Sequence, residues 1–472
     1  MKDFSTLIIA SNFPPIQSAG VYRTLRIVKY LPAYDWQLSV LTLSTSTLSE
    51  GTKLDQNLLD KVSSNISVYR APARFPIQTI NRITGRRSRE RNGKPSTSTN
   101  VKAGVNGSSS SAQTKSWFQQ IKDRVSLPWM TPDRLVGWVG PAAKLGMKAI
   151  RKEGPDVIYS SGPAWSNHLV AKRLVEATVI PWVADFRDPW VGNAFRKNRS
   201  EDSWVGRKHQ QLELGVYQTA NVVIFNTDRA RQDAVKRVGV WLADKSTVIP
   251  NGFDPEDFEG LKPITSSFSG NDDSTRPLRM AHAGSFYGKR NVDSLLQAVG
   301  ELKQSGDLSP CDFQIELIGS LRAHEKSLVE QHEIQDMVTF VPSLPHRKCL
   351  ERLNTADILL LVQTDAPLCV PGKLYEYIAL NKPIYTFSGE GATVDLVTKE
   401  RLGVCIDPSN ISRIKYSITD LVRQHREGIL TAPDDSIAHK YDGHKQMELF
   451  DAAFRRAMDS NCQIRRHHEE SV

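Results

Sequence analysis

Residues 7–43, LIIASNFPPIQSAGVYRTLRIVKYLPAYDWQLSVLTL, decide the fold class of this sequence. The apolar run at 7–10 predicts a short buried strand, and the run at 38–43 predicts a second one. Between them, before Pro32, apolar residues recur at the spacing of one helix face, at Val21, Leu25, Val28 and Leu31. Two strands joined by a loop and a helix predict a parallel sheet with crossover helices.

The same alternation recurs along the rest of the chain. Three further strands are expected in the first half, at 156–159, 181–184 and 221–225, with helices at 167–177 and 204–218. Six more are expected in the second half, at 278–283, 313–318, 338–341, 358–362, 383–387 and 403–406. We therefore expect two α/β domains, at 1–255 and 256–435. Residues 436–472 should form a C-terminal helix, centred on 441–458, that returns toward the first domain and ends in a frayed tail.

Composition bounds the possible functions. The chain has 472 residues, 39% of them hydrophobic, which excludes a disordered chain, and its net charge of +9 permits an anionic partner. Its five cysteines include no C-x-x-C pair, which favours a reducing compartment over a disulfide framework. No stretch approaches the ~18 apolar residues of a spanning helix. We expect a cytoplasmic protein that can also bind the inner face of the cytoplasmic membrane peripherally.

Residues 85–115 differ from their surroundings, because they are rich in Ser, Thr, Gly and Asn and strongly basic. They predict a disordered insertion. A solvated loop explains this composition, and so does an electrostatic contact with anionic lipid headgroups. No recognised nucleic-acid module surrounds the insertion, so we expect no nucleic-acid partner.

Ligands of open parallel sheets bind beyond the carboxyl ends of the strands, so the loops that follow strands deserve the closest inspection. The loop at 12–20 ends at a helix start, where free backbone N–H groups favour an anion. Its small residues, Ser18 to Gly20, would let a phosphate or a sugar approach the backbone, although a tight turn would equally explain Gly20. The loop is neither G-x-G-x-x-G nor a Walker loop, which argues against a dinucleotide-binding oxidoreductase and a P-loop enzyme.

A second loop, at 185–190, places Asp185, Arg187 and Asp188 directly after an expected strand. Two carboxylates beside a guanidinium can bind hydroxyl groups and position a proton acceptor. A structural Arg–Asp pair that braces the loop is the alternative interpretation.

The second domain contributes two more loops. Gly284, Lys289 and Arg290 lie between a strand and a helix start, where a glycine and two cations are suited to a diphosphate. Gly372, Lys373 and Glu376 begin another helix, where an anion and a hydroxyl-bearing group could be held together.

These loops together resemble the family-4 (group 1) glycosyltransferases, the retaining nucleotide-sugar-dependent enzymes of the GT-B fold, particularly those of bacterial surface-polysaccharide synthesis. The resemblance covers most of the chain and rests on FPP at 13–15 with SAG at 18–20, VIPNGFD at 248–254, and PGKLYEY at 371–377 followed by NKP at 381–383. It implies two Rossmann-like, doubly wound parallel-sheet domains that face each other across a cleft. The first would bind the acceptor and the second the nucleotide-sugar donor.

The resemblance also implies roles for individual residues. The donor would be bound by Gly20, Gly284, Lys289, Arg290, Gly372, Lys373 and Glu376. The acceptor would be bound by Ser18, Asp185 and Arg187, and the catalytic residues would be Asp188, Lys289 and Arg290. The family uses a pair of glutamates to hold the donor sugar and the ribose; Glu376 matches the second, whereas Leu368 occupies the position of the first.

The resemblance implies transfer with retention at the anomeric carbon, in which the departing diphosphate helps to take the proton of a glycan or lipid-linked acceptor. The sequence contains no D-x-D triplet and no H-E-x-x-H, so we expect no obligatory metal and no cofactor besides the nucleotide-sugar substrate. Two alternatives stay open because of Leu368. One is a nucleotide-sugar epimerase of the same fold, and the other is a non-catalytic scaffold in a polysaccharide-assembly complex.

Overall fold

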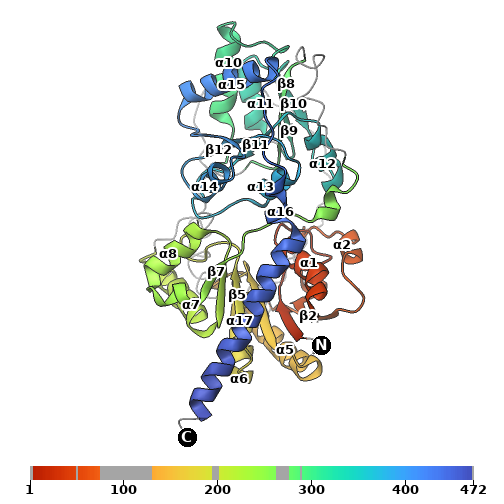
Figure 1. The fold of residues 1–472 in the computed structure, drawn as a ribbon, viewed down its shortest axis with the longest axis vertical. Helices are drawn as coiled ribbons and strands as arrows, with labels where there is room; N and C mark the ends of the chain where they lie inside the picture. The colour runs from red at the N-terminus through yellow and green to blue at the C-terminus, as the bar shows by residue number, and fades with distance from the viewer. Residues whose placement is uncertain are drawn as a thin grey trace, which may run out of the picture.

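The structure is a computed structural model that describes residues 4–48, 51–74, 130–193, 201–261, 276–286, 290–320 and 322–469. The insertion expected at 85–115 lies outside these residues. The molecule has two domains, one above the other along its long axis, and each is built on one parallel sheet (Figure 1). The prediction of two Rossmann-like parallel-sheet domains is therefore confirmed.

The N-terminal sheet has seven strands in the order β3-β2-β1-β4-β5-β6-β7, and every neighbouring pair is parallel. The strands are β1 (Phe4–Ile9), β2 (Trp36–Leu43), β3 (Ser67–Ala71), β4 (Val157–Gly162), β5 (Trp182–Phe186), β6 (Val222–Phe225) and β7 (Ser246–Val248). The main helices are α1 (Val21–Tyr30), α2 (Asn57–Asp60), α5 (Val139–Glu153), α6 (Ser166–Thr178), α7 (Trp204–Thr219), α8 (Asp228–Val238) and α9 (Trp241–Asp244). Leu7 and Ile9 pack into the core on one face of the sheet, and Ile8 packs into the core on the other. Burial on both faces explains why these strands are continuous apolar runs.

The C-terminal sheet has six parallel strands in the order β10-β9-β8-β11-β12-β13. They are β8 (Leu278–Ala283), β9 (Phe313–Ile318), β10 (Val338–Val341), β11 (Ile358–Val362), β12 (Ile384–Phe387) and β13 (Gly403–Ile406). The helices are α10 (Asp293–Gln304), α11 (Ala323–Gln331), α12 (His346–Asn354), α13 (Gly372–Ala379), α14 (Ala392–Lys399) and α15 (Ile411–Arg426). All six strands lie within a residue of their expected positions.

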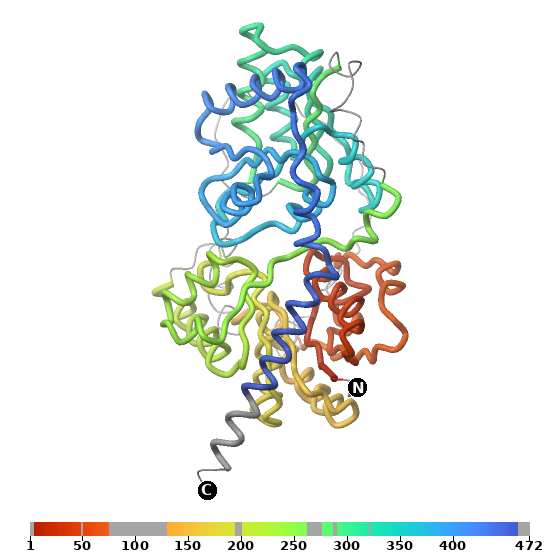
Figure 2. The backbone as a smooth tube through the Cα atoms, viewed as in Figure 1, coloured from red at the N-terminus to blue at the C-terminus, as the bar shows by residue number. Residues whose placement is uncertain are grey.

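The chain crosses between the domains twice, after β7 and again before the last helix (Figure 2). The second crossing runs through α16 (Ser436–Tyr441) into α17 (Gly443–Glu469), which lies along the N-terminal domain. Phe454 of α17 packs edge-on against Trp36, with 5.2 Å between ring centroids, and against Tyr159 at 5.5 Å. The helix extends beyond the frayed end expected near residue 460. Among the described residues, every helix is too short or too polar to cross a membrane.

Candidate active site

Both sheets reverse their strand order beside their first strand, between β1 and β4 and between β8 and β11. Loops diverge at such a reversal and leave a crevice at the carboxyl ends of the strands. Three of the four predicted loops follow strands at these reversals, β1, β8 and β11, and the fourth follows the neighbouring strand β5. The carboxyl ends of the two sheets face each other, because Thr227, after β6, donates a 2.7 Å hydrogen bond to the backbone oxygen of Leu368, after β11.

The predicted donor residues Lys373 and Gly284 meet in the C-terminal domain. A Cβ atom at Gly284 would lie 2.0 Å from the amine of Lys373, so the amine occupies the space that a side chain would take. The φ angle of +153° at Gly284 also favours glycine. Within the described residues, Lys373 forms no ion pair, and burial lowers its pKa. A half-buried cation without a carboxylate partner is suited to a phosphate.

His282, at the end of β8, forms the wall behind this amine. Its Nδ1 lies 2.8 Å from the backbone oxygen of Leu360, so Nδ1 carries the proton and Nε2 is an acceptor. Nε2 has no partner in the described structure and lies 3.2 Å from the Cβ position at Gly284. Burial and the neighbouring Lys373 lower the pKa of His282 to about 3, so the imidazole adds no charge to the site.

Arg290 lies near the Lys373 amine and His282. Its guanidinium contacts the side-chain oxygen of Gln363, directly after β11. Its positive charge reaches both Lys373 and His282, whose pKa values it lowers. Across the cleft, Asp188 acts on the same surroundings. Burial and Asp188 raise the pKa of the Cys369 thiol to about 12, whereas Arg290 lowers it. Asp188 and Arg290, two of the three predicted catalytic residues, thus both act on the charge state of Cys369.

Glu376 lies one turn into α13. Its Oε1 atom is 3.2 Å from Nε2 of His346, the first residue of α12. Tyr22 of α1 approaches from the N-terminal domain, with its ring centroid 5.9 Å from that of His346. Glu376 is 31% exposed, so it remains accessible to a ligand.

Arg187 holds the loop that follows β1 through hydrogen bonds to the backbone. The guanidinium donates to the backbone oxygens of Gly20, at 2.9 Å, and of Pro163. A Cβ atom at Gly20 would lie 2.8 Å from the Asn12 amide and 2.9 Å from the Arg187 guanidinium, so this close packing requires glycine. Arg187 thus shapes the loop, and burial of its side chain leaves little of it for an acceptor. Ser18 lies in the same loop, and its buried hydroxyl has no partner among the described residues.

The prediction that Asp185 binds the acceptor is corrected by its burial. Its carboxylate is fully buried and accepts two 2.9 Å hydrogen bonds from Arg23 of α1, in a bidentate ion pair. Tyr159 and Ser161 donate to the same carboxylate at 2.6 Å and 3.0 Å. No oxygen remains for a substrate. Asp185 therefore braces α1 against the sheet, as the structural alternative proposed, although its partner is Arg23 and not the neighbouring Arg187.

Asp188 differs from Asp185 in its surroundings. Burial raises the pKa of Asp188, while the adjacent Arg187 lowers it. In the described structure no ion pair holds its carboxylate, and its charge acts on the Cys369 thiol of the C-terminal domain. A carboxylate with a raised pKa is better suited to accept a proton than an ordinary one.

Leu368, which stands where the family has a sugar-binding glutamate, contacts the opposite domain. Its side chain packs against the apolar core of the N-terminal domain. The Cδ1 atom lies 3.7 Å from the Cβ position at Gly192. The side chain thus forms an apolar contact between the domains at the position where the family has a carboxylate.

Gly372 and Lys289 are the two remaining residues that were predicted to bind the donor. Gly372 begins α13, is exposed, and has no atom within 4 Å of its Cβ position, so its helix end is uncovered. Lys289 lies outside the described residues.

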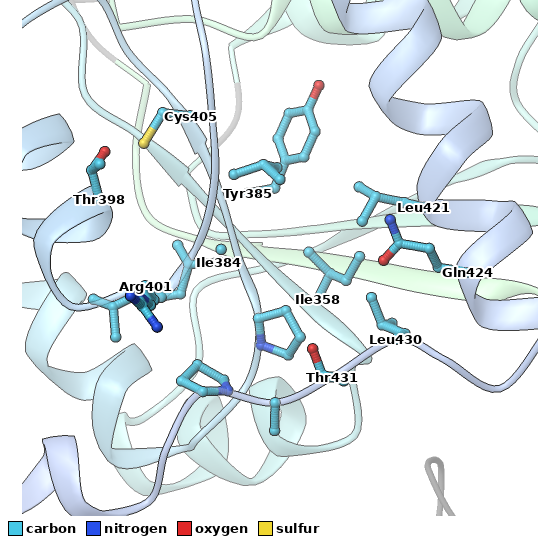
Figure 3. A pocket seen from close by; sticks show the side chains of 16 residues that line it. Ile358, Ile384, Tyr385, Thr398, Arg401, Cys405, Leu421, Gln424, Leu430 and Thr431 are labelled. Atoms are coloured by element: carbon cyan, nitrogen blue, oxygen red, sulfur yellow. The ribbon is translucent and has the colours of Figure 1, made fainter.

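One cavity has a volume of about 370 Å³ and is lined by none of these residues (Figure 3). It is lined by the first residues of three strands, Ile358, Ile384 and Gly403, so it lies at the amino ends of the sheet, opposite the ligand-binding edge. A smaller cavity, of about 250 Å³, lies at the carboxyl ends of β11 and β12. Gln363, the partner of Arg290, lines it, which makes this cavity the continuation of the candidate site.

In the part of the chain that the structure describes, no three His, Cys, Asp or Glu side chains gather as metal ligands would. The expectation that no metal is required stays a prediction. The residues that sequence reasoning missed are His282, His346 and Tyr22. Each left a weak signal: an isolated histidine in an apolar strand, a histidine at a helix start, and an aromatic residue two positions after Gly20.

Two family models match the sequence, one in each half. The model described as "Glycosyl transferases group 1" matches residues 267–428, and the model described as "Glycosyltransferase Family 4" matches residues 107–257. No curated protein matches the chain significantly.

Solved structures of the same fold are similar along nearly the whole chain. Sucrose-phosphate synthase from Thermosynechococcus elongatus is 14% identical, with a TM-score of 0.56 and 100% of both chains covered. Alr3699/HepE from Anabaena, in complex with UDP and glucose, is 12% identical, with a TM-score of 0.56 and coverage of 95% of this chain and 98% of that one. WaaG, a glycosyltransferase involved in lipopolysaccharide biosynthesis, is 12% identical, with a TM-score of 0.53 and the same coverage.

The fold, with its two facing parallel sheets, is that of the GT-B glycosyltransferases. The two family matches further support the chain as a group 1 glycosyltransferase.

Proposed function

We propose that this protein transfers a sugar from a nucleoside-diphosphate sugar to a hydroxyl group of a glycan or lipid-linked glycan, with retention of the anomeric configuration. One observation carries the proposal: the Lys373 amine lies against Gly284 without an ion-pair partner among the described residues, beside Arg290, where the strand order reverses. Two cations gathered at the carboxyl ends of β8 and β11 need an anion to offset their repulsion. A diphosphate supplies that charge.

A nucleotide sugar is the donor class that suits the neighbouring groups. Glu376 can accept hydrogen bonds from ribose hydroxyls while the diphosphate lies on Lys373 and Arg290. The structures of Alr3699/HepE in complex with UDP and with UDP-glucose support a uridine nucleotide as the first donor to test. Lys289 and the uncovered start of α13 at Gly372 would contribute further contacts to the diphosphate.

The reaction follows from this placement. The bond between the anomeric carbon and the phosphate oxygen breaks, and the bond between that carbon and the acceptor oxygen forms on the same face. The proton of the acceptor hydroxyl passes to the departing diphosphate, whose charge Lys373 and Arg290 stabilise. Asp188 would orient the acceptor hydroxyl from the opposite domain, at the end of the loop that Arg187 supports. Positioning and charge stabilisation then supply the catalysis, without a protein nucleophile.

On the acceptor side, we propose that Ser18 and the surface around Asp188 contact the acceptor. WaaG is a glycosyltransferase of lipopolysaccharide biosynthesis, which supports an acceptor of the surface-polysaccharide type. Such an acceptor would be met at the cytoplasmic face of a membrane, where the basic stretch at 85–115 could contact anionic lipid. If residues 85–115 serve only to contact the membrane, their deletion should leave transfer to a soluble acceptor intact. Loss of that activity would contradict this role.

The first experiment is a thermal-shift screen against UDP, GDP, ADP and CMP, each with EDTA present. A ligand that binds only the folded state raises its apparent stability according to concentration over Kd. We expect one diphosphate to raise the melting temperature, and calorimetry would then give its Kd. The absence of a shift with all four would contradict a preformed donor site.

The Lys373→Ala variant links this binding to the proposed residues. A charge-assisted hydrogen bond contributes roughly 1.5–3 kcal/mol, so the Kd of the diphosphate should rise about tenfold or more. Lys303→Ala is a matched control, because Lys303 pairs with Asp336 at the surface of α10. Equal Kd values for the two variants would remove Lys373 from the site.

Two further functions remain consistent with Leu368. An apolar contact at the family's sugar-binding position suits a protein that holds its domains closed as a scaffold, and a missing glutamate suits an epimerase. Product analysis separates the three functions. A transferase consumes donor only with acceptor, an epimerase alters the donor alone, and a scaffold leaves it unchanged.

A further inference from the structure

His346 lies between the candidate ribose-binding carboxylate and the junction of the domains. Nε2 lies 3.2 Å from Glu376 Oε1, and Nδ1 lies 3.7 Å from Oδ2 of Asp257, in the segment that joins the domains. Both ring nitrogens therefore face carboxylates. Among the described residues, the second oxygen of Glu376 has no hydrogen-bond donor, so one oxygen is held and the other is left for a ligand.

We propose that His346 is a positioning residue for ribose recognition: it holds one oxygen of Glu376 so that the other is directed at the ribose hydroxyls of the donor. This inference rests on the proposed function, because it presupposes a nucleotide in the site. It assigns to His346 a role that acts through Glu376 and requires no contact with the nucleotide.

The surroundings of the imidazole favour its protonated form. The hydrogen bond to Glu376 contributes most to a raised pKa of His346, and the charge of Asp257 acts in the same direction. Burial and Lys61, which pairs with Asp257 at 2.6 Å, act in the opposite direction. The phenol ring of Tyr22 lies beside the imidazole, with 5.9 Å between the ring centroids. As an imidazolium, His346 carries a proton on each ring nitrogen, and its hydrogen bond to Glu376 becomes charge-assisted and therefore strongest.

The position of His346 also couples ribose recognition to domain closure. Tyr22 belongs to α1 of the N-terminal domain, and Lys61 follows α2 of the same domain. Both lie against a network of the C-terminal domain and the junction, formed by Glu376, His346 and Asp257. A change in the angle between the domains would therefore move the ring that positions Glu376.

The test measures discrimination between UDP and 2′,3′-dideoxy-UDP by calorimetry on the full chain. For the wild type, we expect UDP to bind about tenfold or more tightly, because the dideoxy ligand leaves the carboxylate without its hydroxyl partners. His346→Ala should reduce this ratio below about threefold, and Glu376→Gln should reduce it similarly. His324→Ala is the matched control, since His324 pairs with Asp293 at the exposed surface. An unreduced ratio in His346→Ala would overturn the inference.

A pH series separates positioning from packing. His346→Gln keeps a hydrogen-bond donor of similar reach but does not titrate. Because the pKa of His346 is raised, the wild type should bind UDP more tightly than this variant at pH 6, and the advantage should fade as pH rises through that pKa. The ionisation of UDP itself cancels in the comparison. A constant ratio of the two Kd values from pH 5.5 to 8.5 would contradict the role of the imidazolium.

Failure of the inference can be told from failure of the proposed function. If the wild type binds UDP but does not distinguish the dideoxy ligand, the inference fails while the nucleotide site stands. If the wild type binds none of the four nucleotides of the screen, the proposed function fails, and the role of His346 fails with it.

Discussion

Two aspartates in the loop after β5 differ in their surroundings and therefore in their expected roles. Asp185 and Asp188 are three positions apart, yet only Asp185 is held in an ion pair in the described structure. Burial alone would raise the pKa of Asp185, but the bidentate contact with Arg23 and the donors around it hold that pKa below its ordinary value. Asp188 has no such partner in the described structure, and its pKa is raised.

Asp185→Asn should therefore destabilise the fold. Breaking a buried ion pair leaves the Arg23 charge uncompensated, which costs about 3–5 kcal/mol in the free energy of unfolding. Because the folded-state pKa of Asp185 is lowered, its contribution is present above its unfolded pKa of about 3.9 and is lost as pH falls below it. Urea unfolding at pH 7 would measure the loss. Asp336→Asn, which breaks an exposed pair with Lys303, should cost less than about 1 kcal/mol; equal costs would contradict the structural role.

Asp188→Asn should instead affect the reaction. If Asp188 orients the acceptor hydroxyl while the diphosphate takes the proton, the neutral amide should lower kcat by roughly 10²-fold. The Kd of the donor diphosphate should stay within about twofold, because the carboxylate faces the acceptor side. Steady-state kinetics with calorimetry would show this, with Asp244→Asn, an exposed change in the same domain, as the control. Unchanged kcat would leave Asp188 without a catalytic role.

Gly284→Ala tests the packing of the Lys373 amine. The new methyl group would lie 2.0 Å from the amine, so the lysine must move, and the φ of +153° adds backbone strain of roughly 1–3 kcal/mol. We expect the Kd of the diphosphate to rise about tenfold, as in Lys373→Ala. The double variant should be no weaker than either single one, because both remove the same contact. Additive losses would mean that Gly284 acts independently of the lysine.

At the scale of elements, α17 ties the two domains together. It leaves the C-terminal domain and buries Phe454 between Trp36 and Tyr159 of the N-terminal sheet. Phe454→Ala should cost about 3–5 kcal/mol, because a fully buried aromatic ring leaves a cavity. Leu449→Ala on the same helix, 43% exposed, should cost less than about 1 kcal/mol. Chemical unfolding would compare them; similar losses would mean that α17 packs loosely.

Helices and strands could be predicted where a continuous or periodic run of apolar residues marks them in the sequence. Apolar runs located the strands of the C-terminal sheet, whereas β3, β7 and α5 were missed. Only one of the five residues of β3 is buried, and β7 has three residues, so neither forms an apolar run. The four site loops could be predicted because they follow strands. Their partners could not: Arg23 meets Asp185 across 162 positions, and Leu360 meets His282 across 78.

At the scale of the whole molecule, the cleft is closed by contacts of different strength. On one side, Leu368 packs into the core of the N-terminal domain and its backbone accepts from Thr227. Beside it, Arg229 of α8 forms an exposed bidentate pair with Asp395 of α14. On the opposite side, Tyr22 lies beside His346.

The exposed Arg229–Asp395 pair should therefore set the balance between open and closed forms without holding the fold together. Its hydrogen bond to Arg229 lowers the pKa of Asp395, so the pair persists at neutral pH and weakens only in acid. Arg229→Ala should raise the radius of gyration of the ligand-free protein in small-angle X-ray scattering, with little change in melting temperature. Exposed pairs contribute about 0.2–1 kcal/mol, which corresponds to at most an approximately fivefold change in the ratio of the two forms.

Salt provides the decisive comparison. At about 1 M salt the Debye length falls to roughly 3 Å, so the wild type should open toward the variant, while Arg229→Ala itself should respond much less. The double variant with Asp395→Ala should scatter like the single one, because the partner is already lost. Saturating diphosphate should close both proteins if the donor bridges the domains. A wild type whose scattering ignores both salt and the substitution would mean that Leu368 and Tyr22 alone keep the cleft closed.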